Sequence, residues 1–334
     1  MSQKLCKILI IIVIPTILWA QKQDSTYAER LGFPKGARVL ILHVDDAGMS
    51  FGSNIGAEMA LTKGASTSVS VMMPCSWVPG FVMFLKSHPE IDAGLHLTLT
   101  SEWEEYRWGP LSGGKQVPGL VDTLGYLWPS VAEVAKHASP NEVEMEINAQ
   151  IMKARSMGFE PTHLDTHMGT VFGSGEFLLR YINIGIKNNI PVMLPGGSDE
   201  LIQAQDKIPD AFIAQLRILG RKLWDSGLPV LDDLHNTSYD WVIPADIAND
   251  DKKLDEFKTA KYIEALKTIK PGLTMMIMHC TETGPDFKYI SDSGPTRKGD
   301  LLAMMNPAFK KALKDQGIIL TNWREVKQRR DKLK

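Results

Sequence analysis

The chain contains little cysteine for its length. Its 334 residues include three cysteines, of which Cys6 lies within the first ten residues. Small secreted domains that depend on disulfides carry far more cysteine, so a disulfide framework is excluded. Cys75 and Cys280 each follow a predicted strand, and the sequence leaves open whether they pair or remain free thiols.

The chain also lacks a strong excess of either charge. Its 37 lysines and arginines nearly balance 39 aspartates and glutamates, which gives a formal net charge of −2. The only basic run lies at the end, where residues 326–334 are expected to form a tail or a solvated helix end. We therefore expect no nucleic acid as a partner.

No apolar run is long enough to span a membrane as a helix. The longest has about thirteen residues, from Ile8 to Ala20, where roughly 20 are needed. It follows Lys4 and Lys7 and precedes a polar segment, which is typical of a secretory signal. We expect residues 1–20 to be a signal peptide cleaved after Ala20, with no stable membrane span remaining and a periplasmic or secreted location.

Linkers and internal repeats are also missing, so a single domain is predicted. Apolar runs typical of strands alternate with helical patterns, and the predicted strands are 39–44, 68–73, 92–99, 162–167, 191–194, 229–234, 273–279 and 318–322. The predicted helices are 53–63, 79–87, 141–157, 175–188, 210–226, 254–269 and 298–316. Eight strands separated by helices favour a single α/β domain, a (β/α) TIM-like barrel of regular or distorted form over residues 37–325, after a lead-in over 21–36.

The longest irregular segment, residues 100–140, follows the third predicted strand. We interpret it as a long loop insertion, and such loops are usually lids or binding loops. It contains Trp103 and Trp108, whose rings could stack on the apolar faces of a sugar or pack the loop onto the barrel.

Polar side chains recur at the carboxyl ends of the predicted strands. They are Asp45 and Asp46; His96; His163, Asp165 and His167; Asp232, Asp233 and His235; and His279. Each alone has a structural interpretation, as a cap or a hydrogen-bonded core residue. In a barrel, however, all these ends converge on one rim, where the active sites of such folds lie.

An aspartate and two histidines taken from this set would form a metal site with open positions for water and substrate. Nitrogen-rich donors suit zinc, whereas magnesium prefers oxygen. We expect a divalent metal, zinc or magnesium, with manganese, cobalt and nickel as further candidates. The three strand 162–167 side chains, His163, Asp165 and His167, alternate with apolar residues and should share one face.

Several ordered motifs then resemble a known family, the YdjC-like carbohydrate deacetylases. That family includes the chitooligosaccharide deacetylases and is related to the polysaccharide deacetylases. The motifs are Asp45 and Asp46 with Gly48 and Asn54 behind them; residues 67–73 after Gly64; Gly94 and His96; His163, Asp165 and His167; Met278 and His279; and Arg297 followed by Asp300. The resemblance covers roughly residues 37–325.

The resemblance implies a metal-dependent hydrolase that removes an N-acetyl group from an amino sugar or oligosaccharide. It implies metal ligation by Asp46, His96 and His167, with Asp45 as the base that deprotonates a metal-bound water attacking the acetyl carbonyl. His279 is a candidate to protonate the departing amine, or a histidine that only binds substrate or orients other groups. Trp103, Trp108 and Arg297 are expected to contact the sugar. His163 and Asp165 are expected to orient His167.

The chain departs from the family pattern beside these positions. His43 stands where the family commonly has Asn, Ala47 where it has Phe, Met168 where further histidines are frequent, and Cys280 where Pro follows the histidine. These changes leave the implied metal ligands intact, but they lie beside the reacting centre and affect which substrate can be expected. Two alternatives therefore remain, a hydrolase of another amide or ester and a non-catalytic carbohydrate-binding barrel, although a base such as Asp45 is not needed for binding alone. The sequence leaves the oligomeric state open.

Overall fold

A computed structural model describes residues 25–333, so the predicted signal peptide lies outside the described residues. Within them, one parallel sheet has seven strands. They are β1 (Arg38–Ala47), β2 (Ser68–Val71), β3 (Ala93–Leu97), β4 (Leu164–Thr166), β5 (Asp233–His235), β6 (Gly272–Met278) and β7 (Ile319–Leu320). All but two residues of β1 and β6 together are buried, as expected for parallel strands covered on both faces.

The strand order shows that the sheet curls as a barrel does. The order is β4, β3, β2, β1, β6, β5, and β7 pairs with the first half of β1. Single parallel bridges, Leu164 to Val192 and Pro195 to Leu231, continue the circle between β4 and β5. The predicted strand 191–194 was wrong in extent, because it makes only these isolated contacts. The fold is therefore α/β with a curled parallel sheet, consistent with a distorted (β/α) barrel.

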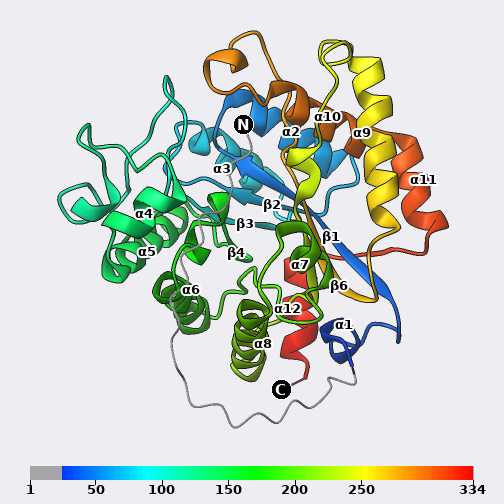
Figure 1. Ribbon diagram of the computed structural model, residues 1–334, viewed down its shortest axis with the longest axis horizontal. Helices are drawn as coiled ribbons and strands as arrows, with labels where there is room; N and C mark the ends of the chain where they lie inside the picture. Colours follow the sequence, from blue (N-terminus) through cyan, green and yellow to red (C-terminus); the bar gives the residue numbers. More distant parts are fainter. Residues whose placement is uncertain (1–24, 334) are drawn as a thin grey trace.

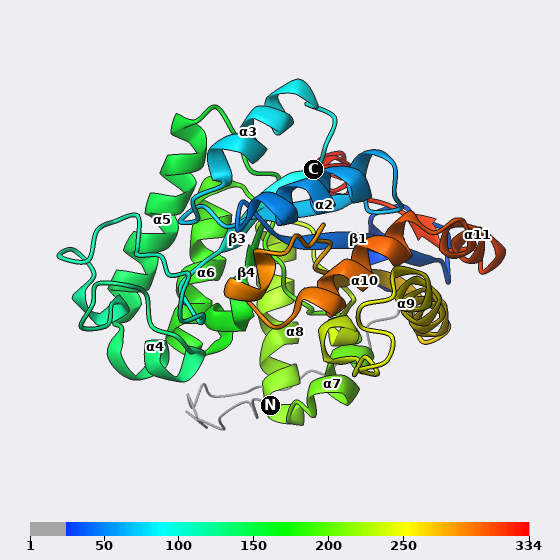
Figure 2. The same cartoon turned by 90° about the horizontal axis from the view of Figure 1, so that it is seen from above.

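Helices surround the sheet in both views (Figures 1 and 2). They are α1 (Tyr27–Arg30), α2 (Phe51–Thr62), α3 (Val78–Ser87), α4 (Val131–His137), α5 (Pro140–Ser156), α6 (Gly175–Asn188), α7 (Glu200–Asp206), α8 (Asp210–Asp225), α9 (Asp251–Leu266), α10 (Gly294–Met305), α11 (Pro307–Asp315) and α12 (Trp323–Asp331). The single helix predicted over 298–316 is two helices, because Pro307 begins α11 and cannot continue α10. No helix in residues 25–333 is long and apolar enough to cross a membrane.

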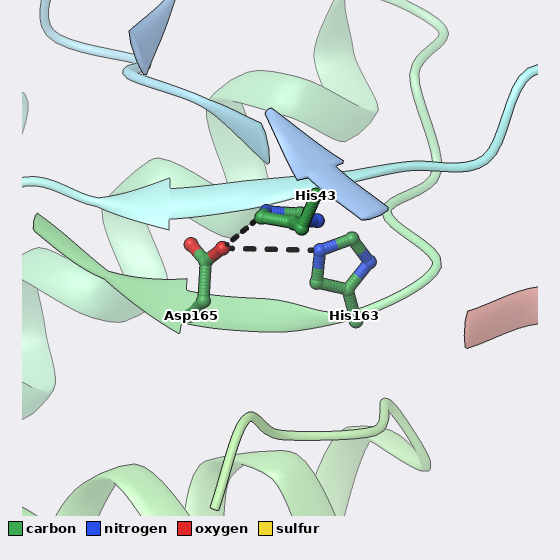
Figure 3. A group of neighbouring side chains, drawn as sticks. All are labelled: His43, His163 and Asp165. Carbon is green, nitrogen blue, oxygen red and sulfur yellow. Dashed lines mark ion pairs between the residues drawn. The ribbon is translucent and has the colours of Figure 1, made fainter. Parts of the chain in front are cut away.

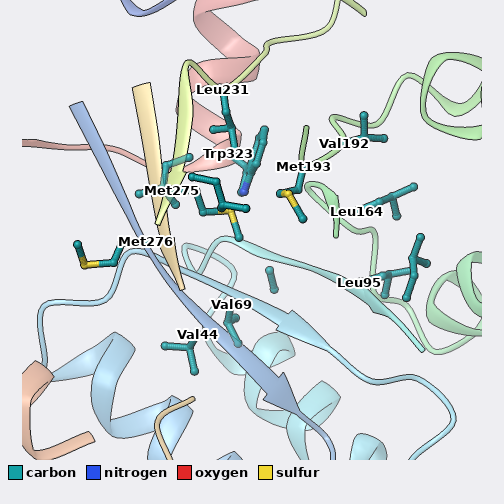
Figure 4. Packing of buried hydrophobic residues seen from close by; sticks show 14 of the residues in the cluster. Val44, Val69, Leu95, Leu164, Val192, Met193, Leu231, Met275, Met276 and Trp323 are labelled. Atoms are coloured by element: carbon teal, nitrogen blue, oxygen red, sulfur yellow. The ribbon is translucent and has the colours of Figure 1, made fainter. Parts of the chain in front are cut away.

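Helix α12 takes in most of the predicted basic tail 326–334, of which residues 331–333 are exposed. Its Trp323 is fully buried in the same core cluster as Leu231, Met193 and Met275 (Figure 4). Arg330, near the end of the helix, is also buried and donates a hydrogen bond to the carbonyl of Trp224. Burial of an indole this large contributes on the order of 3 kcal/mol, so the terminal helix belongs to the barrel core.

Two aspartates predicted at the rim have structural roles instead. Asp232 precedes β5 and accepts hydrogen bonds from the backbone N–H groups of Tyr27, Ala28 and Leu273, which attaches α1 to the amino end of β6. Asp233 accepts hydrogen bonds from the N–H groups of Leu201 and Ile202 at the start of α7.

Cys75 and Cys280 are both buried and form no disulfide, which answers the question of their pairing.

Candidate metal centre

The end of β1 carries a bulge that brings two adjacent carboxylates to one site. Pairing with β2 shifts register between Val44 and Ala47, and Asp46 has a positive φ of 66°. Successive residues of a regular strand point to opposite faces, so without this kink Asp45 and Asp46 would diverge. A left-handed conformation at a non-glycine residue is strained, and such strain persists mainly at functional sites.

Asp46, His96 and His167 converge although they come from separate strand ends. Oδ1 of Asp46 lies 3.3 Å from Nε2 of His96 and 3.4 Å from Nδ1 of His167. All three residues are buried, and within residues 25–333 this same Oδ1 atom has no hydrogen-bond partner. A buried carboxylate oxygen between two ring nitrogens is the donor set of a divalent cation, so these residues fit the metal expected from the sequence.

The electrostatics of the site favour a cation. Burial acts against ionisation of Asp46, but the Arg297 guanidinium, with Nη1 2.6 Å from Oδ2, holds its pKa well below the usual range. Burial likewise opposes protonation of His167, yet Glu102 and Asp46 raise its pKa to about 9. His96 also has a pKa well above its usual value, because Asp45 and Asp165 outweigh its burial. The carboxylates therefore attract positive charge, which a metal would supply in place of the protons.

Two other sets in the described residues could in principle hold an ion. His43, His163 and Asp165 form one of them, with dashed lines joining the Asp165 carboxylate to both rings (Figure 3). However, Nε2 of His43 is only 2.7 Å from Oδ2 of Asp165, closer than the roughly 3.4 Å between two ligands of a tetrahedral zinc ion. In the other set, Asp165 already contacts Nδ1 of His96 at 2.8 Å. We therefore favour Asp46, His96 and His167.

Each histidine of this triad has a carboxylate on its second nitrogen. Asp165 pairs with Nδ1 of His96, while Glu102 lies 3.0 Å from Nε2 of His167. The expectation that Asp165 orients His167 was therefore wrong, since it contacts the other ligand. His163 stacks on Trp323. An acceptor on the far nitrogen leaves the near nitrogen unprotonated, as a metal ligand requires.

Asp45 and His279 lie beside the triad. Oδ2 of Asp45 is 3.8 Å from Nε2 of His96 and 3.9 Å from Nε2 of His279. His279 directly follows β6, and its backbone N–H donates to Asp300, which also binds Lys258 and the hydroxyl of Tyr262. Burial lowers the pKa of His279, so its imidazole is neutral at pH 7. An acidic and a basic group thus face each other next to the candidate metal site.

Comparison with known proteins now places the chain. Residues 39–315 match the family described as YdjC-like protein. The chain belongs to the YdjC-like family. A carbohydrate deacetylase of Thermus thermophilus is 31% identical over 300 residues, covering 90% of this chain and 97% of that protein. A chitooligosaccharide deacetylase of Yersinia enterocolitica is 31% identical over 134 residues, 39% of this chain and 49% of its own length.

A solved structure supports the fold of this YdjC-like protein. The crystal structure of a putative cellobiose-phosphate cleavage protein from Enterococcus faecalis superposes with a TM-score of 0.69. It is 20% identical in sequence and covers 86% of this chain and 98% of that chain. At this identity the likeness establishes the curled α/β architecture alone.

The residues expected to contact a sugar differ in their placement. Trp103 is partly exposed and its ring lies 5.9 Å from the Arg297 guanidinium. Trp108 is buried, and its indole N–H donates to the carbonyl of Thr100, so it packs the loop and presents no free face to a sugar. Arg297 is also buried and is ion-paired with Asp46. Its guanidinium therefore contacts the candidate metal site and is not free to bind a sugar.

The sequence interpretation missed residues that complete this YdjC-like site. Glu102 lies in an irregular loop with no pattern around it, and Ser70 is one of two serines in β2. The signal available was position, because Ser70 lies within β2 and Glu102 follows β3. Lys258 was hidden among the many charged residues of α9, although it is fully buried against Asp300.

Proposed function

We propose that this YdjC-like protein is a metal-dependent hydrolase that removes an N-acetyl group from an amino sugar or oligosaccharide. The proposal rests on Oδ1 of Asp46, which lies between two histidine nitrogens and has no hydrogen-bond partner among residues 25–333. Asp45 lies beside it. The Thermus thermophilus relative, matched over nearly its whole length, is named a carbohydrate deacetylase, which supports the same reaction here.

Asp46, His96 and His167 would hold the metal, and zinc suits their two nitrogens and one oxygen best. When bound, the metal supplies Lewis acidity that polarises the acetyl carbonyl and acidifies water. Arg297 keeps Asp46 ionised for this task, and Asp165 and Glu102 keep the ring nitrogens of the two histidines oriented.

Asp45 acts as the general base in this proposal. Its Oδ2 takes a proton from the attacking water, whose oxygen bonds to the acetyl carbon. The C–N bond then breaks, and the amine nitrogen takes a proton from His279. Because His279 is neutral in the free protein, it receives that proton from Asp45, whose Oδ2 lies 3.9 Å from its Nε2. The proton taken from the water thus reaches the departing amine through Asp45 and His279 alone.

The test is acetate release from a panel of N-acetylated and O-acetylated sugars and oligosaccharides. Protein stripped of metal is expected to be inactive and to recover with zinc, or with magnesium, manganese, cobalt or nickel. Asp45→Asn should lower kcat about 10²–10⁴-fold with little change in zinc affinity, whereas Asp46→Asn should weaken zinc binding itself. Asp246→Asn, at an exposed loop position, is the matched control.

Two results would overturn the proposal. Acetate release that is equal with and without metal would remove the metal from the reaction. No release from any sugar, despite tight zinc binding, would redirect the site to another amide or ester, or to carbohydrate binding without turnover.

A further inference from the structure

His43 is held rigidly beneath the proposed site. It is fully buried, and its ring meets the ring of His163 edge-on, with centroids 5.0 Å apart. His163 in turn stacks on Trp323 with the ring planes 19° apart. Gly94 makes this packing possible, because a Cβ at that position would lie 2.5 Å from the His163 ring. The His43 ring therefore has little freedom to turn.

The only ring nitrogen of His43 with close polar neighbours is Nε2. It lies 3.1 Å from Oγ of Ser70, and that hydroxyl donates to Oδ1 of Asp45 at 3.4 Å. Because the hydroxyl hydrogen points to Asp45, Ser70 accepts the N–H of His43. Nε2 of His43 also lies 3.2 Å from the same Oδ1. Two groups from β1 and β2 thus converge on one oxygen of the carboxylate.

The two oxygens of Asp45 consequently have different surroundings. Oδ1 faces His43 and Ser70, whereas Oδ2 faces Nε2 of His96 and Nε2 of His279. Rotation of the carboxylate would take Oδ2 away from the reacting side. A base must lie within hydrogen-bond reach of the proton that it removes, so this orientation decides whether Asp45 can act.

We propose that His43, acting through Ser70, is a positioning residue that anchors Oδ1 of Asp45 so that Oδ2 is presented to the attacking water. The proposal rests on the proposed function of Asp45 as base. His43 itself is not one of the triad residues, and its side chain is fully buried, out of reach of a substrate.

Asp165 connects His43 to the candidate metal site. One of its oxygens lies 2.7 Å from Nε2 of His43, and the other accepts from Nδ1 of His96 at 2.8 Å. A single carboxylate therefore aligns the anchor of the base and a metal ligand. Replacing Asp165 would disturb both, so the test must be made at His43.

The experiment compares His43→Leu, which removes both ring nitrogens, with His43→Gln, whose amide N–H can reach the position of Nε2. His235→Leu is the control, because it removes the imidazole of another buried histidine, which lies at the end of β5. For each variant, kcat and KM for the best acetylated sugar, zinc affinity by calorimetry and Tm are measured. Crystal structures of the wild type and His43→Leu then report the orientation of the Asp45 carboxylate.

The proposal expects His43→Leu to lower kcat about 10²-fold, in the range of a lost general base, while KM and zinc affinity stay within about threefold. His43→Gln should recover at least tenfold of that loss, and the carboxylate of Asp45 should be rotated in His43→Leu. An unchanged kcat, a parallel fall in zinc affinity, or an unrotated carboxylate would overturn it. If the wild type releases no acetate from any sugar, the proposed function fails, while the crystal structures still decide whether His43 positions Asp45.

Discussion

At the scale of the residue, Glu102 should decide how well His167 binds metal. Its carboxylate lies 3.0 Å from Nε2 of His167 and leaves Nδ1 facing Asp46. We expect Glu102→Ala to weaken zinc binding about 10–100-fold, the usual cost of losing such a partner, and Glu102→Gln to fall between. Competition with a chromophoric chelator measures the affinity. Glu105→Ala, at an exposed position of the same loop, should bind zinc as the wild type does, and equal affinity of all variants would refute the role.

At the scale of the element, α12 is attached to the barrel by an aspartate of another segment. Asp92, just before β3, accepts hydrogen bonds from the N–H groups of Trp323 and Arg324. We expect Asp92→Ala to lower the free energy of unfolding by about 1–2 kcal/mol, as for a lost helix cap, and to speed hydrogen exchange of those two amides. Urea unfolding and exchange measurements test this. Glu90→Ala is the exposed control, and unchanged exchange at both amides would contradict the attachment.

At the scale of the whole molecule, His235 should make the stability depend on pH. Burial lowers the pKa of His235 to about 4 from 6.5, so the folded state keeps this imidazole neutral. Its contribution is fully present above pH 6.5 and is lost as the pH falls toward 4. Between pH 7.5 and 5 the wild type should lose about 2 kcal/mol from this group.

The variant His235→Gln isolates that contribution, because it cannot titrate in this range. Urea unfolding of metal-free protein at both pH values should show the stability gap between wild type and variant narrowing by the same amount, about 2 kcal/mol. A gap independent of pH would mean that His235 is not held neutral. Metal-free protein is used because proton competition for His96 and His167 would otherwise add to the pH dependence.

Much of the fold was predictable because its signals are local. Buried parallel strands are continuous apolar runs, and the predicted strands 39–44 and 273–279 match β1 and β6 to within one residue, except that β1 runs three residues further at its carboxyl end. The segment 191–194 reads equally as a strand, but its partners let it form only single bridges. The break at Pro307 was visible in the sequence, whereas burial of α12 depends on a distant contact with Asp92. The signal peptide, and with it a periplasmic or secreted location, stays a prediction.

The sequence by itself determined which residues stand at the ends of the strands, since apolar runs that end in Asp45, Asp46, His96, His167 and His279 are a property of local order. Only the tertiary structure decided their partners. The bulge at Asp46, the pairing of Asp165 with His96, the contact of Glu102 with His167 and the anchoring of Asp45 by His43 and Ser70 join segments that are far apart along the chain. Such contacts are set by strand register and loop path, which depend on the packing of the whole barrel.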